Sequence, residues 1–158
     1  MRPWFPGIHQ RAWWRATVIG ALLAYILGYL PSTLMNLQAE TTQSAAAPEP
    51  SQGVVLLLAA GMGLVGGAVL SFAQWLVLRK HARGASLWLP ANMLAWMLGM
   101  PVIFWAIDQA RKLNSINQVV PFMAVTLLVV GATVGAVHGL ALVRLALKVQ
   151  AKGKESFV

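Results

Sequence analysis

The sequence contains no cysteine and very little acid. Only four of its 158 residues are Asp or Glu, and charged residues of both signs make up 10% of the chain. Without cysteine there is no disulfide, no thiolate metal site, no iron–sulfur cluster and no cysteine nucleophile. Soluble domains carry about 25% charged residues, so this composition predicts an integral membrane protein. The mean hydropathy of +0.67 agrees with that prediction.

Catalytic motifs are also absent. The acids, which are Glu40, Glu49, Asp108 and Glu155, all fall in polar segments, and the sequence has no paired carboxylate, HExxH, GxSxG or P-loop. The glycines of residues 61–67 follow no predicted strand, so they do not match a dinucleotide-binding loop. We therefore expect a protein that is not an enzyme.

Positive charge is present, and it lies mostly just outside the apolar runs. The net charge is +8 and the isoelectric point is about 11.0, values that in a soluble protein would favour nucleic-acid binding. No nucleic-acid-binding motif accompanies them, and the positions of the cations are those of membrane-span flanks. We expect the partners to be the lipid bilayer, with anionic headgroups at a basic rim, and no nucleic acid.

Four long apolar segments define the predicted fold. They run over about 12–35, 53–79, 86–107 and 119–147, each long enough to cross a bilayer as a helix. Polar loops at 36–52 and 108–118 and a short cationic turn after residue 79 separate them. The sequence thus predicts an all-α, integral membrane four-helix bundle that forms a single transmembrane domain over 1–158.

Orientation follows from the cations in the short loops, because Lys and Arg concentrate on the cytoplasmic side. The side that holds both termini carries nine of them, which are Arg2, Arg11, Arg15, Arg79, Lys80, Arg83, Lys148, Lys152 and Lys154. The other side carries only Arg111 and Lys112. We expect both termini to be cytoplasmic, in a bacterial inner membrane or a thylakoid-type membrane.

The two halves of the sequence resemble each other. The segment Leu22–Gly28 (LLAYILG) recurs 71 residues later as Met93–Gly99 (MLAWMLG), and Gly67-Ala68-Val69 recurs 68 residues later at positions 135–137. This pattern predicts two helical hairpins in tandem, that is, a parallel internal repeat, because each hairpin returns to the same side of the membrane.

Small residues recur every four positions on all four predicted helices. In a membrane such a face lets two backbones come close, so it marks a helix-packing surface. These residues, in chain order, are Gly20, Ala24, Gly28, Gly63, Gly67, Ser71, Ala91, Ala95, Gly99, Gly131, Gly135 and Gly139. We expect the four faces to converge in a compact bundle.

Three polar residues inside the predicted spans are candidates for a ligand site or a polar network. Gln74 and Asn92 are at similar depth on either side of the cationic turn, so we expect their amides to pair. The pair would either join the two helices by a hydrogen bond or bind a ligand. His138 lies deeper, between two glycines, which leaves room for a haem or chlorophyll with His138 as its axial ligand. Because a structural hydrogen bond is the favoured alternative for His138, no cofactor is predicted.

Aromatic residues mark the predicted membrane boundary on the basic side. Tryptophan rings are enriched at the headgroup level, where one edge meets lipid and the other meets water. We therefore expect Trp13, Trp14, Trp75 and Trp88 to act as interface anchors.

A resemblance to a known group rests on two segments, GAVLSFAQWLVLRKHARGASLW and GAVHGLALVRL. The shared features are a glycine-rich helix ending Q-W-x-x-L-R, a short turn followed by Trp, and a last glycine-rich helix ending L-V-R-L. Here they are Gln74, Trp75, Leu78, Arg79, Trp88, Leu142, Val143, Arg144 and Leu145. In these features the chain resembles a group of small uncharacterised four-helix membrane proteins of cyanobacteria and other photosynthetic or filamentous bacteria. The resemblance implies a photosynthetic or bioenergetic membrane and brings no activity.

Together these features predict a non-enzymatic subunit or scaffold that packs laterally against other membrane subunits or against itself. One alternative is a small-solute transporter or channel component with Gln74, Asn92 and His138 along a narrow path. Another is a pigment- or haem-binding subunit that uses His138. The absence of any acid inside the predicted spans argues against proton transport.

Overall fold

The computed structural model describes residues 9–42, 50–82 and 84–155. In this part of the chain the protein is all-helical, with four α-helices and a short 3-10 turn. They are α1 (Gln10–Thr42), α2 (Gln52–Leu78), η1 (Ala85–Leu87), α3 (Trp88–Ala110) and α4 (Ile116–Glu155). The predicted all-α class and the number of helices are thus found.

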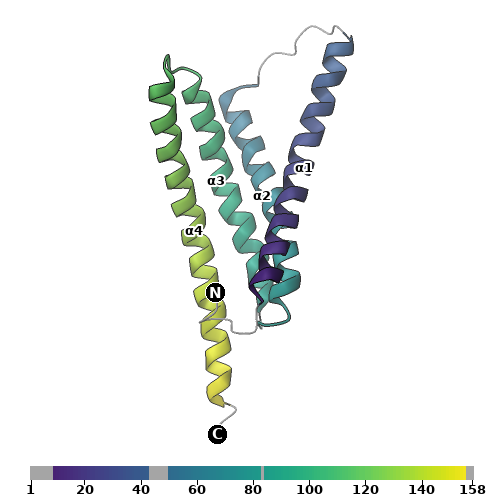
Figure 1. Cartoon of the computed structure of the whole chain (residues 1–158), viewed down its shortest axis with the longest axis vertical. Helices are drawn as coiled ribbons and strands as arrows, with labels where there is room; N and C mark the ends of the chain where they lie inside the picture. The colour runs from purple at the N-terminus through teal and green to yellow at the C-terminus, as the bar shows by residue number, and fades with distance from the viewer. Residues whose placement is uncertain (1–8, 43–49, 83, 156–158) are drawn as a thin grey trace.

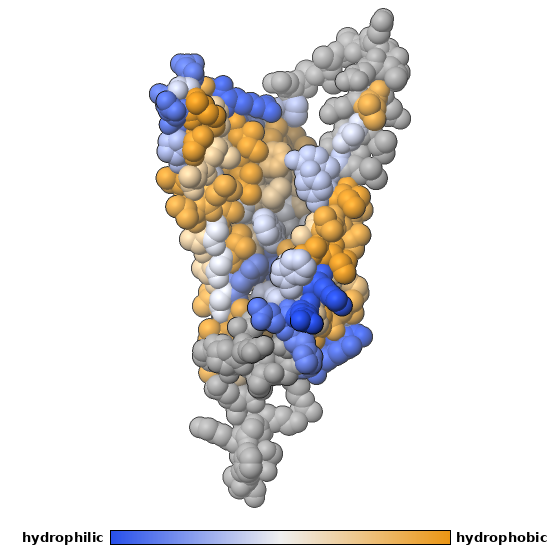
Figure 2. Space-filling model, in the orientation of Figure 1, coloured by the Kyte–Doolittle hydropathy of each residue, from blue (hydrophilic) through white to orange (hydrophobic). Residues whose placement is uncertain are grey.

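Three of the helices are long and apolar enough to cross a membrane. The segments concerned are Gln52–Leu78, Ala85–Ala110 and Ile116–Leu147. Among the described residues α1 is not one of these segments. Figure 2 shows apolar surface along the helices and polar surface toward the two ends.

The helices pack in chain order, as a row. α1 packs on α2, α2 on α3 and α3 on α4, so that α1 and α4 lie at opposite edges of the row (Figure 1). The closest association is between α2 and α3, whose connection is short. Among the described residues the expected convergence of four small-residue faces therefore does not occur, because α1 packs mainly on α2 and α4 mainly on α3.

Two of the helices extend further than predicted. α1 continues to Thr42, seven residues past the predicted end of the first span, and α4 continues to Glu155. The sequence 36–42 is polar but contains neither Gly nor Pro, and polar residues such as Gln and Glu are good helix formers. A change to polar composition therefore marked the edge of the apolar segment and not the end of the helix.

The predicted polar loops are correspondingly shorter. α3 ends at Ala110 and α4 begins at Ile116, so only residues 111–115 connect them within the predicted loop 108–118. Of the predicted loop 36–52, residues 43–49 lie outside the described part of the chain, as do residues 1–8 and Arg83.

The largest buried cluster lies at the basic end of the row. It joins α2, the turn after it, α3 and α4, and its buried members are Leu78, Ala82, Ala85, Trp88, Ala141, Leu145 and Ala146. The left-handed backbone of Gly84 (φ 77°) turns the chain from α2 into η1, a conformation that glycine adopts without steric cost. This cluster fixes the end of the molecule where the predicted polar residues meet.

Candidate site at the basic end of the helices

Gln74 links three helices through its side-chain amide. Its Oε1 accepts a hydrogen bond of 2.8 Å from the indole nitrogen of Trp88 on α3. Its Nε2 donates to the hydroxyl of Thr17 on α1 over 3.0 Å. Gln74 is only 6% exposed. A buried amide that makes both bonds holds α1 and α3 at one level against α2, since polar groups inside a membrane need internal partners.

Thr17 completes a chain of hydrogen bonds. Its hydroxyl also donates to the backbone oxygen of Trp13 over 3.0 Å. The Trp13 ring in turn meets the Trp88 ring edge to face, with centroids 5.7 Å apart and an interplanar angle of 61°. This arrangement is the one that aromatic pairs prefer, so α1 and α3 touch directly above Gln74.

Asn92 does not pair with Gln74, which corrects the expectation from sequence. Its amide nitrogen donates to the backbone oxygen of Trp88, one turn earlier on α3, over 3.2 Å. Its Oδ1 is buried without a hydrogen-bond partner among the described residues. The Gln74 amide is instead occupied by its bonds to Thr17 and to the Trp88 indole.

His138 also lies against Trp88. The two rings are 5.1 Å apart at an interplanar angle of 34°, and His138 is half-buried. Its Nε2 is buried and has no hydrogen-bond partner among the described residues. Two of the three predicted polar residues therefore contact the Trp88 indole: Gln74 accepts a hydrogen bond from its nitrogen, and the His138 ring packs against its ring. We call Trp13, Thr17, Gln74, Trp88 and His138 the Trp88 cluster.

Trp88 is the residue whose predicted role is wrong. It is 3% exposed and hydrogen-bonded in the interior, so it does not anchor the protein in the headgroup layer. The other three tryptophans are more accessible: Trp14 is 66% exposed, and Trp13 and Trp75 are half-buried. The short turn between α2 and α3 places Trp88 beside the end of α2, where its indole nitrogen donates a hydrogen bond to Gln74.

Sequence reasoning missed Thr17 and the core position of Trp88, although one signal was present. The two residues are 71 positions apart, which is the spacing between the first and third helices in the predicted repeat. Thr17 accepts a hydrogen bond from Gln74, and Trp88 donates one to it. Equivalent positions on α1 and α3 therefore flank the same amide of α2.

Small residues of α1, α2 and α3 lie at close helix contacts. A Cβ on Gly67 would be 2.8 Å from the Asn92 backbone oxygen, and one on Gly63 would collide with the Trp96 backbone oxygen. Ser71 and Ala95 are fully buried. A Cβ on Gly20 would be 3.0 Å from the Leu70 backbone oxygen, and one on Gly99 would be 3.2 Å from Val134. At Gly63 and Gly67 the facing backbone leaves no room for a side chain, so these two positions require glycine.

Other predicted packing positions on α1 and α3 are looser. A Cβ on Gly28 would meet only the end of the Met62 side chain, at 3.8 Å, and the Ala24 Cβ lies 3.9 Å from the ideal Cβ position of Gly66. Ala91 is half-buried beside the core cluster. An apolar cleft of about 670 Å³ opens between α1 and α2 at this level, which accounts for the looser contacts.

The three glycines of α4 do not pack against any other described residue, contrary to expectation. In the part of the chain that the structure describes, no atom of another element lies within 4 Å of a Cβ placed on Gly131, Gly135 or Gly139. α4 meets α3 with other residues, among them Val130 and Val134, which contact Gly99. In the first half, Gly63 and Gly67 of α2 pack on the next helix, α3. α4 has no following helix in the described chain, so the corresponding face is open.

The described residues contain no group of three or more His, Asp or Glu side chains that could hold a metal ion. Neither the cleft between α1 and α2 nor a polar pocket at the turn after α2 is lined by Gln74, Asn92 or His138. Gln74 and His138 both contact Trp88 and do not contact each other.

Comparisons with known proteins add no relative. A scan against protein-family models and searches of curated proteins and of solved structures find no match to this chain.

Proposed function

We propose that the protein is a non-enzymatic integral membrane subunit that packs laterally, through the glycine face of α4, against a transmembrane helix of another subunit or of a second copy. The observation that carries the proposal is the open space over Gly131, Gly135 and Gly139. Lipid tails are as apolar as leucine, so helices associate in a bilayer where small residues allow close backbone contact.

The first half of the same chain supports this use of the face. Gly63 and Gly67, spaced as Gly131 and Gly135 are, receive the backbone of α3 so closely that no side chain fits between them. If the predicted repeat holds, the α4 face is built for a helix of the same kind. The missing neighbour would then come from outside the chain.

In this proposal the chain crosses the membrane four times, with α1 as the fourth span and both termini in the cytoplasm. The cations at the Trp88 end would then meet the cytoplasmic leaflet, where anionic lipids attract Lys and Arg. The resemblance to cyanobacterial-type proteins favours a photosynthetic or bioenergetic membrane. We assign the Trp88 cluster a structural role, because Gln74 is satisfied by bonds within the protein.

Purification in a mild detergent tests the proposal. We expect the protein to elute at a mass well above that of one 17.0 kDa chain with its detergent, either with another membrane protein or as an oligomer. A monodisperse monomer without a partner, obtained from the native membrane, would contradict it. A transporter would instead show solute-dependent flux in proteoliposomes that contain this chain alone.

A further inference from the structure

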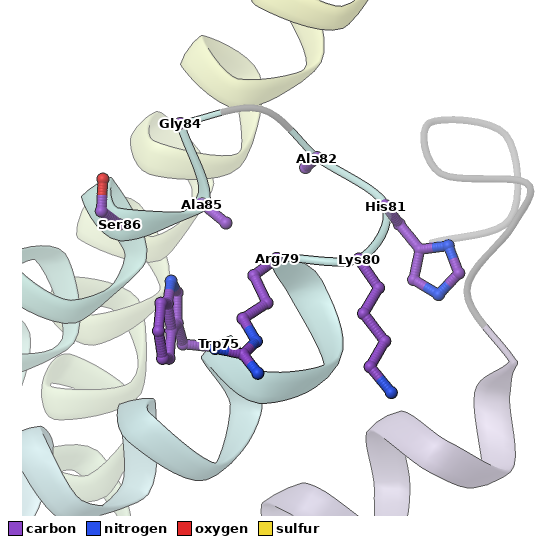
Figure 3. Close-up of a pocket in the computed structure, with 8 residues that line it drawn as sticks. All are labelled: Trp75, Arg79, Lys80, His81, Ala82, Gly84, Ala85 and Ser86. Carbon is purple, nitrogen blue, oxygen red and sulfur yellow. The ribbon is translucent and has the colours of Figure 1, made fainter.

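A polar pocket lies at the turn between α2 and α3 (Figure 3). It measures about 450 Å³ and opens to the surface. The last turn of α2 and the residues that follow form one side, and the start of η1 forms the other. The side chains that matter for its chemistry are Trp75, Arg79, Lys80, His81 and Ser86.

The pocket is cationic and has no internal counter-ion. Arg79, Lys80 and His81 are all exposed, and no acidic residue is among those that line it. In the described part of the chain the only ion pair joins Asp108, in the last turn of α3, to Lys112, which follows that helix. Two permanent positive charges on neighbouring residues repel each other, so an anion between them is favoured.

Trp75 positions the positive charge of Arg79. The Arg79 guanidinium lies over the indole ring, 4.9 Å from its centroid, in a cation–π contact. Figure 3 shows these two side chains together, with Lys80 and then His81 following along the chain. Stacking occupies the flat face of a guanidinium and leaves its N–H edge free, and that edge is the part that binds phosphate oxygens in pairs.

Ser86 supplies a neutral donor. It lines the pocket, is exposed and carries a hydroxyl, which adds to the site that the charged side chains define.

The depth of the pocket identifies the kind of anion. Trp75 belongs to the apolar segment Gln52–Leu78, whereas Arg79 and Lys80 follow directly after that segment ends. The pocket therefore spans the boundary between the apolar surface and the polar end, which is where lipid phosphates lie. We propose that this pocket binds the phosphate group of an anionic phospholipid, one lipid at a defined site rather than a diffuse layer at the basic rim.

Native mass spectrometry of the purified protein tests the site. The probes are phosphatidylglycerol and phosphatidylcholine, added separately to the delipidated protein, with the bound fraction measured against concentration. We expect phosphatidylglycerol to bind more tightly. Arg79→Gln should weaken that binding by about fivefold, the factor expected for one basic residue near an anionic surface, and Lys80→Gln should do the same.

Arg144→Gln is the matched control. Arg144 is exposed, lies next to core residue Leu145 at the same end of the molecule, and does not line the pocket. Its removal should leave phosphatidylglycerol affinity unchanged. Equal losses in Arg79→Gln and Arg144→Gln would overturn the proposal in favour of diffuse charge, and equal affinity for the two lipids would overturn it outright.

Two further measurements distinguish lipid binding from binding of free phosphate, and the effect of positive charge from that of the planar guanidinium. Inorganic phosphate should not displace bound phosphatidylglycerol at comparable concentration; displacement would overturn the lipid assignment and indicate a site for the free ion. Arg79→Lys keeps the charge but loses the planar fork and its stacking on Trp75, so it should retain only part of the affinity. Because a lone monomer would still bind lipid here, these outcomes do not depend on docking through α4.

Discussion

The indole nitrogen of Trp88 donates a 2.8 Å hydrogen bond to the side-chain oxygen of Gln74. Since both residues are almost fully buried, the bond is protected from water and competes only with other groups inside the protein. It fastens the start of α3 to the end of α2. With the bond from Gln74 to Thr17 on α1, it makes one amide the common attachment of three helices.

Gln74→Leu should destabilise the protein. Leucine keeps most of the volume but leaves the Trp88 N–H buried without an acceptor, and an orphaned donor costs about 1–3 kcal/mol. The measurement is reversible unfolding in mixed detergent micelles, followed by helical circular dichroism. A double-mutant cycle with Trp88→Phe should give a coupling of about 0.6–2 kcal/mol, the range for hydrogen bonds between membrane helices.

Asn92→Leu is the control for that experiment. Asn92 is also fully buried, but its oxygen has no partner among the described residues, and the carbonyl it contacts belongs to its own helix. Leucine has nearly the same shape, so the substitution should be almost neutral or stabilising. If Asn92→Leu and Gln74→Leu had equal effects, the special role of Gln74 would be wrong.

The sequence predicts much of the fold because the bilayer imposes simple rules. Long apolar segments, their order and the buried glycines of α2 follow from length and spacing alone, and α2 is found within one residue of its predicted bounds. The position of Trp88 does not follow. Tryptophan suits both a headgroup layer and a core, and only the path of the short turn over Gln74 decides between them.

The glycines of α4 show a second limit. Gly131, Gly135 and Gly139 have the same spacing as the buried small residues of α2. This spacing predicts that a helix can pack on the face, but it does not identify the helix that does so. The row arrangement leaves α4 with one neighbour in the chain. A pattern along one helix carries no information about whether its partner belongs to the same polypeptide.

Gly67→Val and Gly135→Val should therefore differ in their effects on the isolated chain. A Cβ at residue 67 would be 2.8 Å from a backbone oxygen of α3, whereas one at residue 135 would meet nothing within 4 Å. Because backbone cannot yield as a flexible side chain can, Gly67→Val should lower the free energy of unfolding by about 1–3 kcal/mol or more. Gly135→Val should leave it unchanged in monomers, as measured by detergent unfolding.

The absence of cysteine makes the topology simple to test. Ser86 and Ser115 are both exposed, the first in η1 and the second directly before α4. With both termini cytoplasmic, a membrane-impermeant maleimide should label Ser115→Cys on intact cells and Ser86→Cys only after the cells are opened. Labelling in the reverse order would invert the proposed orientation.

An absorption spectrum tests the alternative use of His138. We expect protein purified from its native membrane to show no Soret or chlorophyll band, since the His138 ring is already in contact with Trp88. A band that disappears in His138→Leu would instead establish a pigment or haem at that residue and refute its structural assignment.

Lateral packing through α4 is tested most directly by a pair of leucine substitutions. Gly135 and Ala136 are both exposed, and consecutive residues point about 100° apart around a helix, so Gly135→Leu obstructs the glycine face while Ala136→Leu adds bulk beside it. Each variant is expressed in the native membrane, extracted in mild detergent and weighed by native mass spectrometry. We expect wild-type protein and Ala136→Leu to retain the partner or second copy and Gly135→Leu to lose it. Equal retention in both variants, or its absence from all three proteins, would contradict the proposal.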